Sequence, residues 1–227
     1  MKKVIIIGGS RGIGRAIIKT LVIDCEIINI SRTPADIEND NLTQYQCDVL
    51  EDDLPEISEA DTLIYCPGSI NLKPISRLSI DVFQNDFNIN VLGAVKVIHK
   101  YLPLLKKGSN SSILLFSTVA VKLGMPFHAS IATAKGGVEG LVKSLGAELA
   151  PTIRVNAIAP TVTDTGLAAN LLRNDQMKEK MIERHPLKKY LDPQEVAEMA
   201  AFLISDKAAS ISGQIFSMGC GIVTLKL

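Results

Sequence analysis

The sequence predicts an α/β fold, a doubly wound and mostly parallel sheet of seven strands with helices on both faces. Short β-branched runs alternate with longer helical segments along the 227 residues, and such alternation favours right-handed strand–helix–strand crossovers. Several runs are apolar at successive positions, as expected for parallel strands buried on both faces. The length suits one domain spanning residues 1–227, and no repeat, low-complexity tract or linker divides it.

The seven strands are predicted from the apolar runs. In chain order they span 3–9, 26–32, 43–49, 62–68, 111–118, 153–160 and 213–218. Only about ten residues join the second strand to the third, and about twelve join the third to the fourth. A full crossover helix needs a dozen residues or more. We therefore expect one face of the sheet to be thinly covered there.

Five helices are predicted between and after these strands. They span 12–22, 80–106, 130–149, 167–184 and 193–204. The start of the last helix carries the clearest signals. Asp192 can cap it, Pro193 suits its first turn, and Glu195 completes a box-like amino terminus.

Composition bounds the possible partners and the compartment. Lys plus Arg and Asp plus Glu both number 24, so the formal net charge is zero. This balance gives no electrostatic reason to expect nucleic acid or an acidic membrane surface as a partner. The apolar run near the amino terminus is too short for a secretory segment, and no stretch approaches the roughly 20 apolar residues of a membrane span.

The cysteines favour a reducing compartment. The four are scattered, without a CxxC pair or a nearby histidine run: Cys25, Cys47, Cys66 and Cys220. Such spacing predicts reduced thiols in a cytoplasmic protein and no metal site.

A glycine-rich turn follows the first predicted strand and opens the first helix. In the stretch "IIIGGSRGIGRAI", glycines at Gly8, Gly12 and Gly14 let the backbone turn sharply and approach a pyrophosphate. The helix amino terminus adds amide donors and the positive end of its dipole. We predict a nucleotide site here, with Ser10, Arg11 and Ile13 completing the turn.

The end of the second strand discriminates between cofactors. Sites for NAD usually place an acidic residue there to accept hydrogen bonds from the ribose 2′-hydroxyl. This chain has Ser31 and Arg32 instead, and a second cation at Arg11. Arginine binds a 2′-phosphate through charge-assisted, bidentate hydrogen bonds. The pattern favours NADP over NAD, the alternative being that Arg32 is a solvated loop residue.

Motifs along nearly the whole chain resemble those of the short-chain dehydrogenase/reductase family, which has a Rossmann fold. "GGSRGIG" is similar to the family's glycine motif, and "DPQEVAEMAAFLISDKAASISGQ" to its carboxyl-terminal signature. The sequence departs from the family pattern at Ile7, Thr161 and Gly219. The resemblance implies cofactor contacts from four further segments: Asp48 and Val49 in "CDV", Pro67 and Gly68 in "YCPG", Asn90 in "NINVLGA", and Pro160, Thr163 and Thr165 in "RVNAIAPTVTDT".

The family's catalytic serine, tyrosine and lysine fall here on Thr118, Ile131 and Lys135. The resemblance also implies that Asn90 is the active-site asparagine and that Lys135 binds the nicotinamide ribose. Threonine keeps a hydroxyl, with Ser117 a lesser candidate, whereas isoleucine has no proton to give. Losing a positioned acid costs about 10²–10⁴-fold in rate.

Two other side chains are candidates for the missing acid. His128 lies one helical turn before Ile131, so it faces the same pocket if the helix begins early enough; alternatively it is a solvent-exposed loop residue. Tyr190 is a weaker candidate.

Three functions stay open at this point. The first, which the sequence favours, is an atypical NADP-dependent oxidoreductase acting on a small molecule. The second is a non-redox enzyme on the same scaffold, and the third is a nucleotide-binding protein without catalysis. The resemblance further implies a homodimer or homotetramer through the segments 85–105 and 130–149. Residues 163–190 are expected to cover the substrate, although a plain surface helix would look the same.

Overall fold

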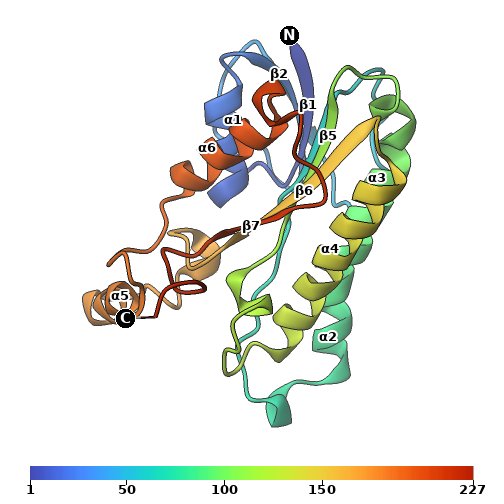
Figure 1. The fold of residues 1–227 in the computed structure, drawn as a ribbon. Helices are drawn as coiled ribbons and strands as arrows, with labels where there is room; N and C mark the ends of the chain where they lie inside the picture. The colour runs from blue at the N-terminus through green and yellow to red at the C-terminus, as the bar shows by residue number, and fades with distance from the viewer. Residues whose placement is uncertain (227) are drawn as a thin grey trace.

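The computed structural model describes residues 1–226 and confirms the predicted fold class (Figure 1). Its strands are β1 Lys2–Ile7, β2 Cys25–Ser31, β3 Leu42–Gln46, β4 Thr62–Tyr65, β5 Ser111–Phe116, β6 Ile153–Pro160 and β7 Ile215–Met218. They form one sheet in the order β3-β2-β1-β4-β5-β6-β7, and every pairing is parallel. The order reverses between β1 and β4. In sheets of this kind, ligands bind beyond the carboxyl ends of the strands at such a reversal.

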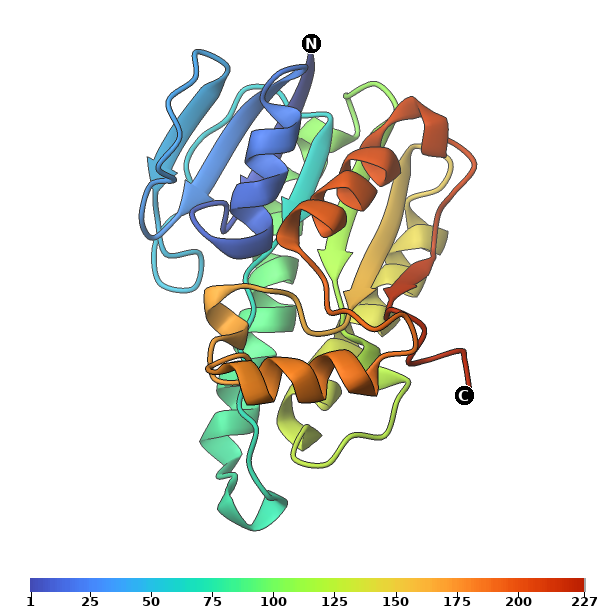
Figure 2. The ribbon, with the colours of Figure 1, turned by 90° about the vertical axis from the view of Figure 1, so that its left-hand side faces the viewer.

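Helices cover both faces of the sheet, as predicted. On one face lie α1 Gly12–Leu21 and α6 Pro193–Ile204, which pack together (Figure 2). On the other face lie α2 Ile80–Phe87, α3 Gly93–Leu105 and α4 Ala129–Glu148 (Figure 1). Each layer buries its own apolar cluster against the sheet. Helix α5, Asp175–Arg184, lies beyond the carboxyl ends of the strands (Figure 2).

Two details of the sequence interpretation are confirmed. The links 32–41 and 47–61 contain no helix, so the sheet is thinly covered beside β3. At the start of α6, the Asp192 side chain accepts from the backbone of Gln194, and the Glu195 carboxylate accepts from Asp192 N. This reciprocal pair is a capping box.

The helix predicted over 80–106 is interrupted. A π-helical turn, Asn88–Leu92, separates α2 from α3. Within it, the side-chain amide of Asn90 donates to the carbonyl of Asp86 at 2.7 Å. The Asn90 side chain therefore binds the Asp86 carbonyl, which in a regular α-helix would accept from the Asn90 backbone N–H. π turns of this kind are frequent at functional sites.

The helix predicted over 167–184 is also wrong in extent. A short 3₁₀ turn, Gly166–Ala168, comes first, and α5 begins only at Asp175. Asn174 fixes this start because its side chain accepts a hydrogen bond from Met177 N at 2.9 Å.

Among residues 1–226, no helix combines the length and the apolar character that crossing a membrane requires.

Candidate functional site

Two cavities lie at the carboxyl ends of the central strands. The first, here called the glycine-turn cavity, is lined by residues from the ends of β1, β2 and β4. The second, here called the lysine cavity, lies between the end of β5, α4 and the segment 160–171. Gly68 lines both cavities, so they form adjoining parts of one site. An extended ligand could therefore occupy both.

Most of the predicted site residues line one of these two cavities. The glycine-turn cavity is lined by Gly8, Ser10, Arg11, Ser31, Arg32, Asp48, Val49, Pro67 and Gly68. The lysine cavity is lined by Ile13, Gly68, Thr118, Lys135, Pro160, Thr163 and Thr165. Gly12, Gly14 and Asn90 line neither cavity.

The glycine turn has the geometry of an anion site. Gly8 adopts φ +77°, in the left-handed region that favours glycine, and a Cβ at Gly14 would lie only 2.4 Å from the Gly8 carbonyl oxygen. No side chain caps the amino terminus of α1, so none competes with a ligand for the amides of its first turn. These features fit a pyrophosphate.

Asn29 holds this turn in place and is not among the predicted site residues. It is fully buried in β2, and its Oδ1 accepts from Gly9 N at 3.0 Å. Its amide donates to Ser31 Oγ at 3.1 Å. A buried polar residue inside the apolar run "EIINIS" is the sequence signal that could have identified it.

Two exposed arginines flank the glycine-turn cavity. Arg11 and Arg32 both line it, and neither forms an ion pair among residues 1–226. Ser31 is different, because it is buried and its hydroxyl donates to Thr33 O at 2.7 Å. The positive charge at this cavity thus comes from the two guanidinium groups.

Lys135 is the buried cation of the second cavity. Its Nζ donates to the Phe116 carbonyl at 2.8 Å, and burial lowers its pKa to about 8. The neighbouring Cys66 thiol is neutral, since burial raises its pKa to about 12. Ile131 lies one helical turn before Lys135, is 5 % exposed and lines the same cavity, as does Thr118.

A buried polar network lies beside Lys135. The carboxylate of Asp86 is fully buried and accepts hydrogen bonds from Ser69 Oγ at 2.5 Å, from Asn71 Nδ2 at 2.8 Å and from Ser130 Oγ. Asn90 donates to Ser69 Oγ at 3.0 Å. The carbonyl oxygen Oδ1 of Asn90 is buried and has no partner among the described residues, so it is available to a ligand group or a water molecule.

Asp86 is also missing from the predicted site. Its partners lie 15, 17 and 44 residues away along the chain, so no local spacing reveals them. Its charge also favours the protonated form of Lys135, although burial has the larger effect on the pKa of that lysine.

The remaining candidates are placed as follows. Ser117 is buried and its hydroxyl donates to Glu139 at 2.7 Å. His128 is half-buried, lines the lysine cavity and holds its Nδ1 2.7 Å from Pro126 O. Tyr190 lines neither cavity. Thr161, where the family pattern has glycine, bonds through its hydroxyl to His185 Nε2 at 2.8 Å.

Comparison with known proteins gives matches over nearly the whole chain. A family model described as enoyl-(acyl carrier protein) reductase matches residues 15–223. The chain is 27 % identical over 235 residues to carbonyl reductase [NADPH] 2 of Sus scrofa, covering 96 % of this chain and 95 % of that protein. It is 30 % identical over 177 residues to 3-oxoacyl-[acyl-carrier-protein] reductase of Thermotoga maritima, covering 78 % and 71 %.

Solved structures of other proteins are similar to this fold over nearly the whole chain. Aldohexose dehydrogenase of Thermoplasma acidophilum superposes with a TM-score of 0.89 at 25 % identity, covering 99 % of this chain and 95 % of that one. At 23 % identity, where likeness shows the fold alone, 3-ketoacyl-(acyl-carrier-protein) reductase of Brucella melitensis complexed with NADH has a TM-score of 0.86 and covers 98 % of each chain. A variant of ElxO with NADPH bound has a TM-score of 0.87, also at 23 % identity, and covers 99 % of each chain.

Proposed function

The chain belongs to the short-chain dehydrogenase/reductase family, and within that family we propose an NADP-dependent oxidoreductase that acts without the usual catalytic tyrosine. The observation that carries the proposal is the lysine cavity, which Thr118, Lys135 and Ile131 all line. A hydroxyl and an ammonium group are in place, and a hydrocarbon side chain stands where the family pattern has an acid. A nicotinamide cofactor follows from the family.

The residues present fit NADP. The uncapped start of α1 and the close approach at Gly14 suit the pyrophosphate. Arg11 and Arg32 are positioned at the glycine-turn cavity to bind a 2′-phosphate. Lys135, with the orphaned Oδ1 of Asn90 nearby, suits the nicotinamide ribose.

The chemistry then divides between the cofactor and the cavity. When bound, the reduced nicotinamide supplies a hydride. The Thr118 hydroxyl donates a hydrogen bond to the substrate oxygen, and Ile131 excludes water from that position without offering a proton. Reduction of an activated carbon–carbon double bond suits this arrangement, because hydride adds to carbon and solvent protonates the oxygen-stabilised anion.

Ile131 also favours a second candidate, a nucleotide-binding protein without catalysis. The two candidates share the cofactor site and differ only in turnover. Asn90, Thr118 and Lys135 keep their register in the sequence, and this retention is the reason for preferring the enzyme.

An equilibrium titration of the purified protein with NADPH and NADH tests the cofactor assignment. We expect tighter binding of NADPH, since the 2′-phosphate meets two guanidinium groups instead of a carboxylate. Tighter binding of NADH would contradict it. Turnover is then tested by following NADPH oxidation with an activated enone such as 2-cyclohexen-1-one, and its absence in a protein that binds NADPH would favour the non-catalytic candidate.

We also propose a homodimer or homotetramer in the cytoplasm. On α4, a Cβ at Gly140 would meet no atom within 4 Å, so a second copy could approach closely there, and Phe87, Leu92 and Val95 are exposed on the adjoining helices. All four cysteines are free thiols, which supports the compartment. A stable monomer in analytical ultracentrifugation would overturn the assembly.

A further inference from the structure

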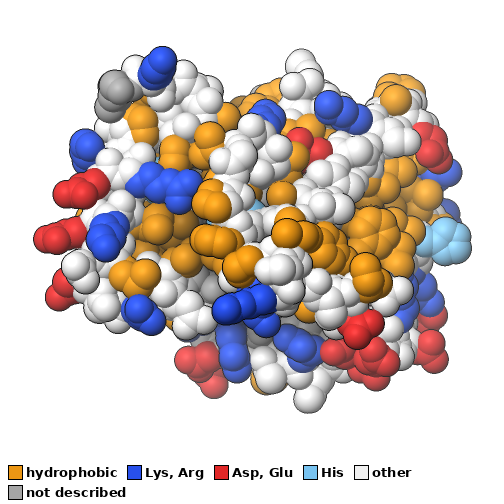
Figure 3. All heavy atoms as spheres, turned by 90° about the horizontal axis from the view of Figure 1, so that it is seen from below, with side chains coloured by type: hydrophobic (Ala, Val, Ile, Leu, Met, Phe, Trp, Pro, Cys, Tyr) orange, Lys and Arg blue, Asp and Glu red, His pale blue; other side chains and the backbone are white. Residues whose placement is uncertain are grey.

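The substrate end of the lysine cavity is mainly apolar. Its lining includes six aliphatic and thioether side chains: Ile70, Met125, Ile131, Val162, Leu167 and Leu171. Apolar side chains gather on this face when the molecule is seen from the carboxyl ends of the strands (Figure 3). Lys135 is the one charged side chain in the lining.

Most polar side chains of the lining already donate their protons to protein atoms. Ser69 donates to Asp86, and Ser117 donates to Glu139. Thr163 donates to the carbonyl of Thr161 at 3.0 Å. These hydroxyls cannot also donate to a substrate.

The Thr161 hydroxyl is engaged in the same way through His185. The ring nitrogen Nδ1 of His185 lies 2.6 Å from the Met181 carbonyl, which can only accept, so Nδ1 carries the hydrogen. Nε2 is then an acceptor, and Thr161 donates to it. A sugar-like substrate would find few donors for its many hydroxyls here.

Three polar side chains of the lining remain, and one of them, Thr165, belongs to the predicted cofactor contacts, which leaves Thr118 and His128 beside the substrate. Thr118 Oγ1 accepts from Ala120 N at 3.3 Å, which leaves its own proton available. His128 Nδ1 faces the Pro126 carbonyl and carries its hydrogen for the same reason as in His185, so Nε2 of the neutral ring is an acceptor and has no hydrogen to donate to a carbonyl oxygen. Both residues line the lysine cavity.

From this distribution of groups we infer that the substrate is a neutral, largely apolar molecule whose one polar oxygen accepts a hydrogen bond from Thr118. The inference rests on the proposed function, since it assigns Lys135 to the cofactor. An anionic substrate would have to be buried against aliphatic side chains without a partner for its charge, which is costly. A polyol would leave several hydroxyls unpaired.

A matched pair of ketones tests the inference by binding, without turnover. The NADPH-saturated protein is titrated with 4′-methylacetophenone and with 4-acetylbenzoate, followed by ligand-observed NMR at neutral pH. The two probes have similar shape, and only the second is ionised. We expect the neutral ketone to bind at least about tenfold more tightly, which corresponds to about 1.4 kcal/mol.

Two exposed leucines provide a variant and its control. Leu167 is 53 % exposed and lines the cavity, whereas Leu187 is 62 % exposed and does not. Leu167→Lys should narrow or reverse the preference by pairing with the carboxylate, and Leu187→Lys should leave it unchanged. Equal or tighter binding of 4-acetylbenzoate by the unmodified protein, or no binding of either ketone by protein that binds NADPH, would overturn the inference. Failure to bind NADPH would instead contradict the proposed function.

Discussion

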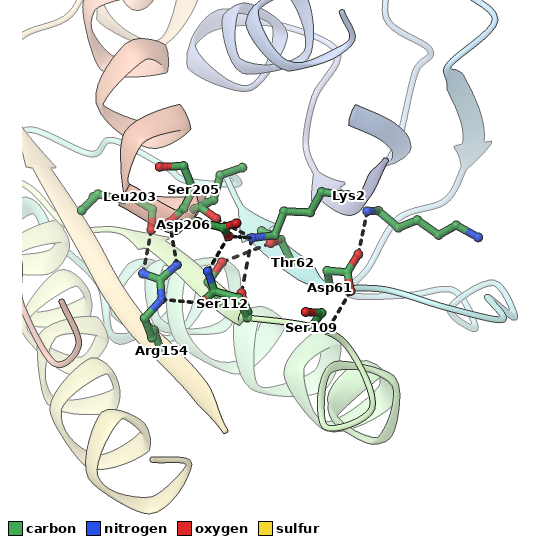
Figure 4. Close-up of polar contacts among 12 residues, drawn as sticks. Lys2, Asp61, Thr62, Ser109, Ser112, Arg154, Leu203, Ser205 and Asp206 are labelled. Atoms are coloured by element: carbon green, nitrogen blue, oxygen red, sulfur yellow. Dashed lines mark hydrogen bonds and ion pairs between the residues drawn. The ribbon is translucent and has the colours of Figure 1, made fainter. Parts of the chain in front are cut away.

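The two ends of the sheet use buried polar groups in different ways. At the amino ends of the strands, Arg154 of β6 donates to the carbonyls of Leu203 at 2.8 Å and Ser205 at 3.3 Å, and Lys2 donates to Ile204 O at 2.7 Å (Figure 4). All three carbonyls belong to the carboxyl terminus of α6, where cations are favourable. These hydrogen bonds anchor the carboxyl terminus of α6 to β1 and β6 of the sheet.

At the carboxyl ends, the polar groups bind one another and leave capacity for a ligand. Asp86 gathers donors from three separate segments, Lys135 makes one hydrogen bond to the backbone, and Asn90 Oδ1 has none among residues 1–226. At the amino ends of the strands, Ser111 Oγ is also buried without a hydrogen-bond partner among the described residues. However, Ser111, Lys2 and Arg154 line neither cavity. The comparison teaches that buried charge alone does not mark a site, whereas incomplete hydrogen bonding beside a cavity does.

The largest expected effect comes from placing an acid at position 131, where the resemblance to the family implies the catalytic tyrosine. Ile131→Tyr should raise NADPH-dependent reduction of 4′-methylacetophenone at least about 100-fold over Ile131→Phe, since a positioned acid is worth about 10²–10⁴-fold. The phenylalanine variant controls for the added ring. Equal rates in the two variants would show that the hydroxyl does not reach the reacting oxygen.

The next effect separates stability from binding. Arg154→Met should lower the free energy of unfolding by about 3 kcal/mol, because the α6 carbonyls lose charge-assisted hydrogen bonds in a buried place. Urea unfolding measures the loss, and NADPH affinity of the folded variant should not change. Lys207→Met, an exposed change nearby, should stay within about 0.5 kcal/mol of the parent. Weakened NADPH binding with full stability would contradict the division between the two ends.

Arg32→Ala should weaken NADPH binding about tenfold and leave NADH binding unchanged, because only the phosphorylated cofactor pairs with the guanidinium. Fluorescence titration with both cofactors measures the split. Arg15→Ala is the matched control, since Arg15 pairs with Asp36 at 3.8 Å and lines neither cavity. An equal loss for both cofactors would place Arg32 away from the 2′-phosphate.

The smallest effect is a pH dependence of cofactor affinity. The Lys135 ammonium is fully present below its pKa of about 8 and is lost as pH rises through that value. NADPH affinity should therefore fall by a few-fold between about pH 7 and 9, and the fall should be absent in Lys135→Met. A parent and variant with the same profile would remove Lys135 from the cofactor site.

The lowered pKa of Lys135 also changes how the free energy of unfolding depends on pH. The folded-state pKa of Lys135 lies below the ordinary value of 10.5, so the unfolded chain binds more protons between about pH 8 and 10.5. The contribution of this lysine to stability therefore rises with pH across that window.

The predicted site residues that follow from local patterns are brought near one another in the structure. The glycine turn, the two arginines and the α4 register of Ile131 and Lys135 follow from short spacings, and the structure places them at two adjoining cavities. The π turn at Asn88–Leu92 could not be predicted, because an unbroken apolar pattern runs through it. The Asp86 network joins segments distant in the chain, and only the fold brings them together.

The bond between Thr161 and His185 is a further example of long-range pairing. Thr161 stands where the family pattern has glycine, and its hydroxyl is hydrogen-bonded to His185 at the end of α5. From the sequence this position was only a departure from a pattern. The structure gives it a physical role in fixing the wall of the lysine cavity.

Backbone hydrogen–deuterium exchange with and without NADPH tests the central claim most directly, because it reports both ends of the sheet in one experiment. The account predicts slower exchange in residues 8–14 and 66–70 on adding NADPH, with no change around Arg154 and Lys2. Unchanged exchange in the glycine turn, or protection confined to the amino ends of the strands, would contradict it.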